Sequence, residues 1–405
     1  MKPIVRAGRM KPVHSDIRGP LFVEAMKRQK QGIDILKLNT GNPATFGFGL
    51  PDSIKNALLE HMQDGVGYCD FKGMPQARQA ICDYETSKGI KGITSDDVFI
   101  GNGVSEVVSF ALTPLLNDGD EVLVPSPSYS LWGNSIYLEG GKPVFYTCDE
   151  KANWYPDIKD IRSKITDKTK AIVIINPNNP TGVLYPKELL LEIIQIARES
   201  GLLIFADEIY DRLVMDGKQH ISLASLTEDV PVITLNGLSK SHCLCGYRCG
   251  WMVISGPREL TEDYRQGIIQ LTSLRLCANT MAQIVIPAAL DDMETPASMV
   301  RPGGRIYEQR EATVRELEKI DGLSFIKNDA AFYVFPKLDV KKFNITNDKQ
   351  FAHDLLDATN ILLVPGSGFD WKDPDHFRIV MLPQADILSD AIRRMGTFLD
   401  GYKQK

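Results

Sequence analysis

The sequence lacks a long unbroken apolar stretch and a concentrated run of basic residues. No window approaches the roughly 20 consecutive apolar residues that a membrane helix needs, so we expect no membrane partner. The 46 basic and 52 acidic side chains give a net charge of −6, and no basic cluster is arranged to follow a phosphate backbone. We therefore expect no nucleic acid partner. The beginning of the chain is basic and rich in proline but has no apolar core of a secretory signal, which predicts that the protein is not exported.

Cysteine is sparse and irregularly placed. The 7 cysteines do not follow the spacing of a disulfide framework, which favours a cytoplasmic location. Cys243, Cys245 and Cys249 lie near His242, but a second pair of ligands at the spacing of a zinc site is missing. We interpret these cysteines as free thiols in a packed loop and expect no metal.

The composition that remains is that of an ordinary globular protein. With 405 residues, of which 43% are hydrophobic and 24% charged, the chain can bury a large core and is expected to form two domains. Short runs rich in Val and Ile alternate with helical patterns between about residues 97 and 255, which is typical of parallel strands joined by crossover helices. The fold class is therefore α/β, with seven predicted strands in one mostly parallel sheet: 97–101, 121–125, 143–147, 171–176, 202–207, 232–236 and 250–255.

Apolar residues at steps of three and four predict helices over 52–63, 105–116 and 186–200. After about residue 300 the pattern changes to a long amphipathic helix through Arg310 and Leu317, followed by short apolar runs. This change predicts a smaller α+β domain.

Three polar residues follow successive strands of the predicted sheet. Asp207 follows Asn179, and Lys240 follows Asp207, at a distance of one strand-helix-strand unit of about 30 residues. Ligands of open parallel sheets bind beyond the carboxyl ends of the strands, so all three side chains can face one crevice.

An amide, a carboxylate and an amine in one crevice suit a cofactor that has an aldehyde and a pyridine ring. Asp207 can keep the ring nitrogen protonated, and Lys240 can form the Schiff base and move the proton. For that role we expect desolvation and nearby cations to depress the Lys240 pKa. Asn179 and Tyr210 can donate hydrogen bonds to a phenolate oxygen.

The phosphate of such a cofactor needs donors. The turn 101–105 opens a helix with free backbone N–H groups, Ser105 adds a hydroxyl, and Arg248 adds a forked cation. Each piece alone also has a plain structural interpretation, as a tight turn, a helix cap or a solvated lysine. The order and spacing of the pieces together favour catalysis.

These segments resemble the fold-type I pyridoxal-phosphate enzymes, specifically the class I/II aminotransferases, over nearly the whole chain. Ser239-Lys240 followed by Gly246-Tyr-Arg248 resembles the lysine signature of that family, although Gly237 stands where many members have a phosphate-binding serine. The segments 179–182 and 207–210 resemble its ring-binding segments. The resemblance implies pyridoxal 5'-phosphate as the cofactor, with these cofactor-binding residues: Tyr68, Val104, Ser105, Tyr129, Asn179, Asp207, Tyr210, Ser239, Lys240 and Arg248.

The resemblance also implies substrate contacts and an assembly. Gly41 and Asn179 would contact the substrate, Arg378 would bind its α-carboxylate, and Arg18 would meet the second carboxylate of glutamate. Tyr68 would reach the phosphate of a neighbouring subunit, which implies a homodimer with shared active sites. The implied division of the chain is an N-terminal lid segment over 1–48 belonging to the small domain, a large cofactor-binding domain over 49–299, and a C-terminal small domain over 300–405.

Within the family, five segments are most similar to the bacterial glutamate-pyruvate aminotransferases: 16–20, 38–43, 67–70, 205–211 and 275–279. The expected substrates are thus L-alanine and 2-oxoglutarate, giving pyruvate and L-glutamate by a ping-pong cycle. The alternatives are an aminotransferase of aromatic, branched or aspartate specificity, or a carbon-sulfur β-lyase. A transcription regulator built on this fold is disfavoured, because we find no helix-turn-helix segment.

Overall fold

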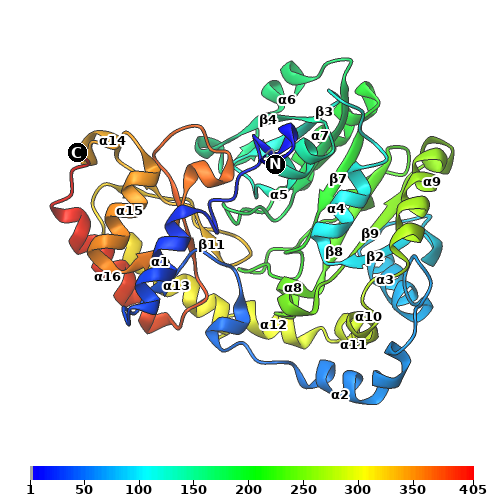
Figure 1. Cartoon of the computed structure of the whole chain (residues 1–405), viewed down its shortest axis with the longest axis horizontal. Coiled ribbons are helices and arrows are strands. Elements are labelled where there is room, and N and C mark those ends of the chain that lie inside the picture. The colour runs from blue at the N-terminus through cyan, green and yellow to red at the C-terminus, as the bar shows by residue number, and fades with distance from the viewer. Residues whose placement is uncertain (1–2) are drawn as a thin grey trace.

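The computed structural model describes residues 3–405, and its centre is one large twisted sheet (Figure 1). All seven predicted strands are present in this sheet, together with an eighth, β5, which has only two residues and was not predicted. The strands in spatial order are β2 (Val98–Asn102), β9 (Cys249–Ser255), β8 (Val232–Gly237), β7 (Leu203–Asp207), β6 (Thr169–Ile175), β3 (Glu121–Ser126), β4 (Lys142–Asp149) and β5 (Tyr155–Pro156).

The centre of the sheet is parallel, because β4, β3, β6, β7 and β8 pair in the same direction. Strand β9 runs antiparallel between β8 and β2. Alternate residues of β6 enter different cores: Ile172 and Ile174 pack on one face of the sheet, and Ala171 and Val173 on the other. Since both faces are covered, the strands are apolar throughout, as parallel strands usually are.

Helices cover both faces of the sheet and extend into the rest of the molecule (Figure 1). The predicted helices over 52–63, 105–116, 186–200 and through Arg310 and Leu317 correspond to α2, α4, α7 and α13. The α-helices are α1 (Pro20–Lys30), α2 (Asp52–His61), α3 (Pro75–Ser87), α4 (Val104–Leu112), α5 (Leu131–Leu138), α6 (Ile158–Lys164), α7 (Lys187–Ser200), α8 (Leu238–Ser241), α9 (Arg258–Arg275), α10 (Thr280–Ile284), α11 (Ile286–Asp291), α12 (Glu294–Val300), α13 (Arg305–Leu317), α14 (Val340–Phe343), α15 (Asp348–Thr359) and α16 (Ala385–Asp400).

The two ends of the chain meet in a smaller body beside the large sheet, where α1 lies near α15 and α16 (Figure 1). Leu36 and Lys37 pair in parallel with Ile361 and Leu362. A separate apolar core fills this body, from Leu38 near the beginning of the chain to Leu399 near its end. This packing supports our proposed division into a large domain and a small domain that uses both termini. The short strands are β1 (Leu36–Lys37), β10 (Leu323–Ser324), β11 (Tyr333–Val334), β12 (Lys337–Leu338), β13 (Ile361–Leu362), β14 (Val364–Pro365) and β15 (Phe377–Val380).

Among residues 3–405, no single helix is long and apolar enough to cross a membrane. Within the same residues, only α9 and the segment Thr280–Asp291 together have the length and composition of a membrane span. The chain bends by 119° between these two helical segments.

Candidate active site

The crevice at the carboxyl ends of β6, β7 and β8 holds the three residues that the sequence singles out. Asp207 is the last residue of β7, Asn179 follows β6, and Lys240 lies in α8 directly after β8. The Nζ of Lys240 donates a hydrogen bond to the carbonyl oxygen of Gly41 at 3.0 Å. The Nη1 of Arg378, in β15, donates to the Oδ1 of Asn179 at 2.9 Å. The structure therefore brings predicted residues from four distant segments into one place.

The segment around Gly41 is in close contact with the smaller body. A Cβ atom on Gly41 would overlap the hydroxyl of Tyr333 and the ring of Phe332. The carbonyl of Asn39, two residues earlier, accepts a hydrogen bond from the Nη2 of Arg378. One short segment thus contacts both Lys240 and Arg378, and glycine is required at position 41 because there is no room for a side chain.

Asp207 is a buried carboxylate without a cation. Its Oδ2 accepts a hydrogen bond from the indole Nε1 of Trp132 at 3.1 Å. Asp207 forms no salt bridge with any residue from 3 to 405. Burial raises its pKa to about 6, although the hydrogen bonds from Trp132 and the Ile209 backbone act in the opposite direction. The carboxylate of Asp207 therefore lacks a positively charged partner, and a protonated ring nitrogen would provide one.

We expect Asp207→Asn to stabilise the cofactor-free chain at pH 8. The pKa of Asp207 is raised from 3.8 to about 6 on folding. Its contribution to stability is therefore fully present below the unfolded value and is lost as the pH rises through the folded one. The loss amounts to about 3 kcal/mol. Melting curves of cofactor-free protein should show a higher Tm for the variant at pH 8 and no difference near pH 4. A lower Tm for the variant at pH 8 would contradict the assignment.

Arg378 is a buried guanidinium without an anion. The side chain is 2% exposed, and its guanidinium carbon lies 4.6 Å from the ring centroids of Tyr333 and of Phe369. Burial lowers its pKa, and among the described residues no carboxylate pairs with it. Its Nε has no hydrogen-bond partner within residues 3–405. A carboxylate of a small ligand would satisfy this charge with two parallel hydrogen bonds.

The surroundings of Lys240 differ from our expectation. Burial lowers its pKa, but Coulombic interactions with Tyr333, Cys245 and Tyr129 outweigh burial and leave the pKa above its ordinary value. Arg378 opposes them. The prediction of a depressed Lys240 pKa is therefore wrong for the chain without a cofactor, because oxygen and sulfur atoms surround the amine more closely than cations do.

The predicted phosphate site lies where α4 begins. No side chain caps the first turn of α4, and Gly103 precedes it with a positive φ of 85°, which favours glycine. The guanidinium of Arg248 lies against Gly103, with its Nη1 donating to the carbonyl of Cys245 at 3.1 Å. Val104 and Ser105 start the helix, and the side chain of Ser105 is exposed. The uncapped N–H groups of α4 and the nearby guanidinium of Arg248 are the hydrogen-bond donors that a phosphate requires.

The side chains of the other predicted site residues are not joined to this cluster by hydrogen bonds within residues 3–405. Tyr68 is 84% exposed and Tyr129 is 37% exposed. Arg18 is exposed and lines a hollow of about 490 Å³ together with Phe22 and Thr40. The side chain of Ser239 is half-buried beside Lys240. Their roles stay predictions.

The three clustered cysteines do not gather around one point. Cys249 is buried in an apolar core formed with residues of α3, β2 and β9, Cys243 packs against Met299, and Cys245 lies near Lys240. All seven cysteines are free.

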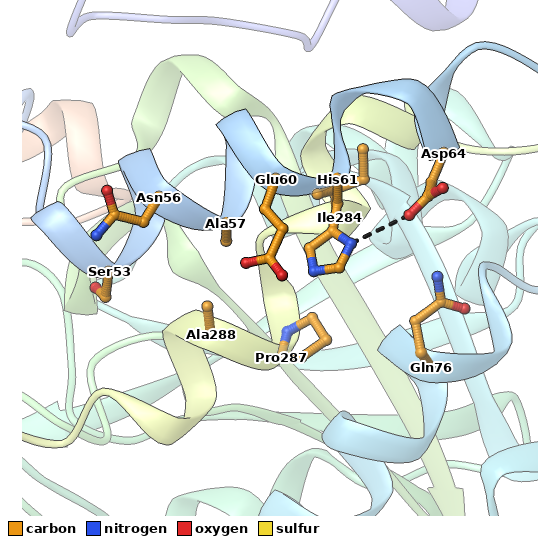
Figure 2. Close-up of a pocket in the computed structure, with 10 residues that line it drawn as sticks. All are labelled: Ser53, Asn56, Ala57, Glu60, His61, Asp64, Gln76, Ile284, Pro287 and Ala288. Atoms are coloured by element: carbon orange, nitrogen blue, oxygen red, sulfur yellow. Dashed lines mark hydrogen bonds and ion pairs between the residues drawn. The ribbon is translucent and has the colours of Figure 1, made fainter.

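A second hollow of about 360 Å³ lies between α2 and the helices α10 and α11 (Figure 2). His61 points toward Asp64 there, with 3.2 Å between Nδ1 and Oδ2. None of the predicted site residues lines this hollow, so it is separate from the candidate active site.

Three further residues belong to the site but were not predicted as site residues from the sequence. Trp132 holds Asp207, Cys245 lies beside Lys240, and the hydroxyl of Tyr333 is 2.8 Å from that of Tyr210. Trp132 lies three residues after Tyr129, a predicted cofactor-binding residue, so its position in the sequence could have indicated that it lies near the site. Nothing in the sequence separates Tyr333 from a core aromatic residue.

Comparisons with known proteins agree with this geometry. Residues 33–392 match the family model described as aminotransferase class I and II. The chain is 50% identical over 404 residues to the glutamate-pyruvate aminotransferase AlaA of Haemophilus influenzae, and the match covers 100% of both chains. The crystal structure of an aminotransferase from Escherichia coli has a TM-score of 0.98 at 46% identity, covering 100% of both chains. An alanine aminotransferase from Pyrococcus furiosus has a TM-score of 0.92 at 40% identity, covering 98% of this chain and 100% of that one. The chain therefore belongs to the class I and II aminotransferase family.

Proposed function

We propose that this protein is an alanine transaminase that transfers the amino group of L-alanine to 2-oxoglutarate, giving pyruvate and L-glutamate by a ping-pong cycle. The family is pyridoxal-phosphate-dependent, and the proposed cofactor is pyridoxal 5'-phosphate on Lys240. The full-length similarity to a glutamate-pyruvate aminotransferase at 50% identity supports the choice of substrates.

One observation carries the proposal: a carboxylate and a guanidinium are buried near the same amine, each without a counter-ion among the described residues. Arg378 donates to the carbonyl of Asn39, and Lys240 donates to that of Gly41, two residues later. Lys240 also lowers the pKa of Asp207. Burying an isolated charge is costly, so a site that keeps two of them is built for a ligand with matching charges. A ring nitrogen that carries a proton suits Asp207, and an amino acid carboxylate suits Arg378.

When it is bound, pyridoxal phosphate supplies an aldehyde carbon and an electron-withdrawing ring. Lys240 would then act as general base and acid, taking the proton from the substrate Cα and returning it at the other reacting carbon. Asp207 would keep the ring nitrogen protonated, and Tyr210 and Asn179 would donate hydrogen bonds to the ring oxygen. Arg378 and Gly41 would orient the substrate so that its Cα proton faces Lys240.

The phosphate would be held by the amino terminus of α4, by Ser239 and by Arg248. Tyr129 would stack on the ring, and Arg18 would meet the second carboxylate of glutamate. The exposed Tyr68 supports a homodimer in which this residue completes the site of the partner subunit. The segments near it carry further exposed apolar side chains, since Val66 is 77% and Leu274 82% exposed. We propose a cytoplasmic location, which the seven free thiols support.

The test of this proposal is a product analysis of the purified protein. With alanine and 2-oxoglutarate, it should form pyruvate and glutamate in equal amounts, and its visible absorbance band should disappear after borohydride reduction. Omission of the oxo acid should stop turnover after one equivalent of pyruvate. Release of ammonia from a sulfur amino acid, supplied without an oxo acid, would reject transamination in favour of β-elimination. A colourless protein that does not take up pyridoxal phosphate would reject the whole assignment.

Arg378→Lys should weaken the interaction with the carboxylate of both substrates. A lysine cannot reproduce two parallel hydrogen bonds to a carboxylate, so kcat/KM for alanine and for 2-oxoglutarate should both fall about 100-fold. Steady-state kinetics measure this change, with the visible band as the check that the cofactor is still bound. An unchanged kcat/KM would show that Arg378 does not hold the substrate. As a control, Arg258→Lys changes an exposed arginine on α9 whose Nε pairs with Glu262 at 2.9 Å, and we expect no effect.

A further inference from the structure

Cys245 occupies a defined place beside the amine of Lys240. Its Sγ donates a hydrogen bond to the carbonyl oxygen of Ser239 at 3.0 Å. The same sulfur lies 3.9 Å from the Nζ of Lys240 and 3.9 Å from the carbonyl oxygen of Gly41. Since the Nζ of Lys240 also donates to the Gly41 oxygen at 3.0 Å, a sulfur and an oxygen both face the amine.

The Lys240 pKa is raised in the chain without a cofactor, but the amine must be neutral when it accepts the substrate proton. Two acceptors are the number that a neutral amine can use. A neutral primary amine has two N–H donors and one lone pair, whereas an ammonium has three donors and no lone pair. When both N–H bonds point at fixed acceptors, the direction of the lone pair is fixed as well. A general base transfers a proton efficiently only when its lone pair is aligned with that proton.

We propose that Cys245 is a positioning residue, whose sulfur acts with the Gly41 carbonyl to hold the freed amine of Lys240 so that its lone pair faces the substrate Cα. This inference rests on the proposed transaminase function. The sulfur sets the orientation of the amine and does not itself react with the substrate.

Several groups besides Cys245 determine the charge of this amine. Burial lowers the Lys240 pKa, Tyr333, Cys245 and Tyr129 raise it, and Arg378 lowers it. Asp207 also interacts with it. Removal of the sulfur therefore removes one influence that favours the ammonium, and the pKa of the free amine should decrease.

The experiment compares Cys245→Ala and Cys245→Ser in the holoenzyme. Single-turnover reaction with alanine, followed by the loss of the visible band, should be about fivefold slower in C245A, because one weak hydrogen bond to the amine is lost. The apparent Kd for alanine should stay within about twofold, since the Arg378 contact is intact. The acid limb of the pH-rate profile should move to lower pH. C245S keeps an acceptor at this position and should recover most of the rate.

Cys82→Ala is the matched control, because Cys82 is a buried thiol in α3 that does not contact Lys240. A C245A enzyme with the rate and pH profile of the wild type would overturn the inference, and so would a C245S enzyme as slow as C245A. In both cases the wild-type reaction itself would still support the transaminase assignment. A wild-type enzyme that does not react with alanine would overturn both.

Discussion

Lys240→Ala should lower the rate of transamination by at least about 10⁴-fold, because it removes the only amine proposed to bind the cofactor covalently and to move the substrate proton. Borohydride reduction followed by mass spectrometry should find the cofactor attached to Lys240 in the wild type and to no residue in the variant. The fold should be retained, because the variant removes a partly buried amine whose main hydrogen bond is to the single carbonyl of Gly41.

The control for this prediction is Lys142→Ala. Lys142 lies on β4, its side chain is 65% exposed, and it pairs with Glu121 at 2.9 Å. This variant should keep the activity and the covalent attachment of the wild type. Covalent attachment that persists in Lys240→Ala would show that another amine is the reactive group.

The sequence was sufficient for the main architecture because the buried strands are nearly continuous apolar runs. Strand β6, for example, buries residues on both faces, so its pattern is strong. Strand β5 was missed because it consists only of Tyr155 and Pro156, which is too short for any periodicity. The antiparallel direction of β9 is set by its pairing with β8 and β2, and the pattern of apolar residues within a strand does not encode direction.

The site could be predicted in part for a similar reason. Asn179, Asp207 and Lys240 stand out because polar residues at the ends of buried strands need an explanation. Trp132 and Tyr333 are aromatic residues in apolar surroundings, and only the folded chain shows that Trp132 donates to Asp207. The direction of the Lys240 pKa shift depends on which atoms surround the amine in space. That arrangement joins segments as distant as Gly41 and Tyr333, so the sequence could not supply it.

Lys88→Met should lower the free energy of unfolding by about 3–5 kcal/mol, because it leaves three buried carboxylates without their common cation. The Nζ of Lys88 lies 2.6 Å from Glu85 Oε2, 2.8 Å from Glu208 Oε2 and 3.3 Å from Asp211 Oδ2. These carboxylates also accept hydrogen bonds from groups on other strands, as Asp211 does from the Nδ2 of Asn236 at 2.7 Å. The cluster therefore joins α3 to the end of β7, which carries Asp207, and to the end of β8, which precedes Lys240.

The loss of stability should depend on pH. Burial raises the pKa of Glu85 to about 7, and Lys88 acts to lower it. A raised pKa means that the contribution of Glu85 to stability is fully present below its unfolded value of 4.5 and is lost as the pH rises through 7. Without the ammonium, the repulsion among the ionised carboxylates is uncompensated, so the variant should be most destabilised above pH 8 and much less below pH 6.

Urea unfolding of the wild type, Lys88→Met and the double variant Lys88→Met/Glu85→Gln tests this account at pH 6 and pH 8.5. The double variant has one carboxylate fewer, so it should recover part of the stability at pH 8.5. Lys91→Met is the control, because Lys91 forms an equally short pair with Glu228 at 2.8 Å but is 70% exposed. Solvent screens such a pair, and the control should unfold at the urea concentration of the wild type. Equal effects of the two substitutions would show that the buried cluster is no more important than a surface ion pair. A loss in Lys88→Met that does not change with pH would instead point to packing of the lysine stem, because the stem does not titrate.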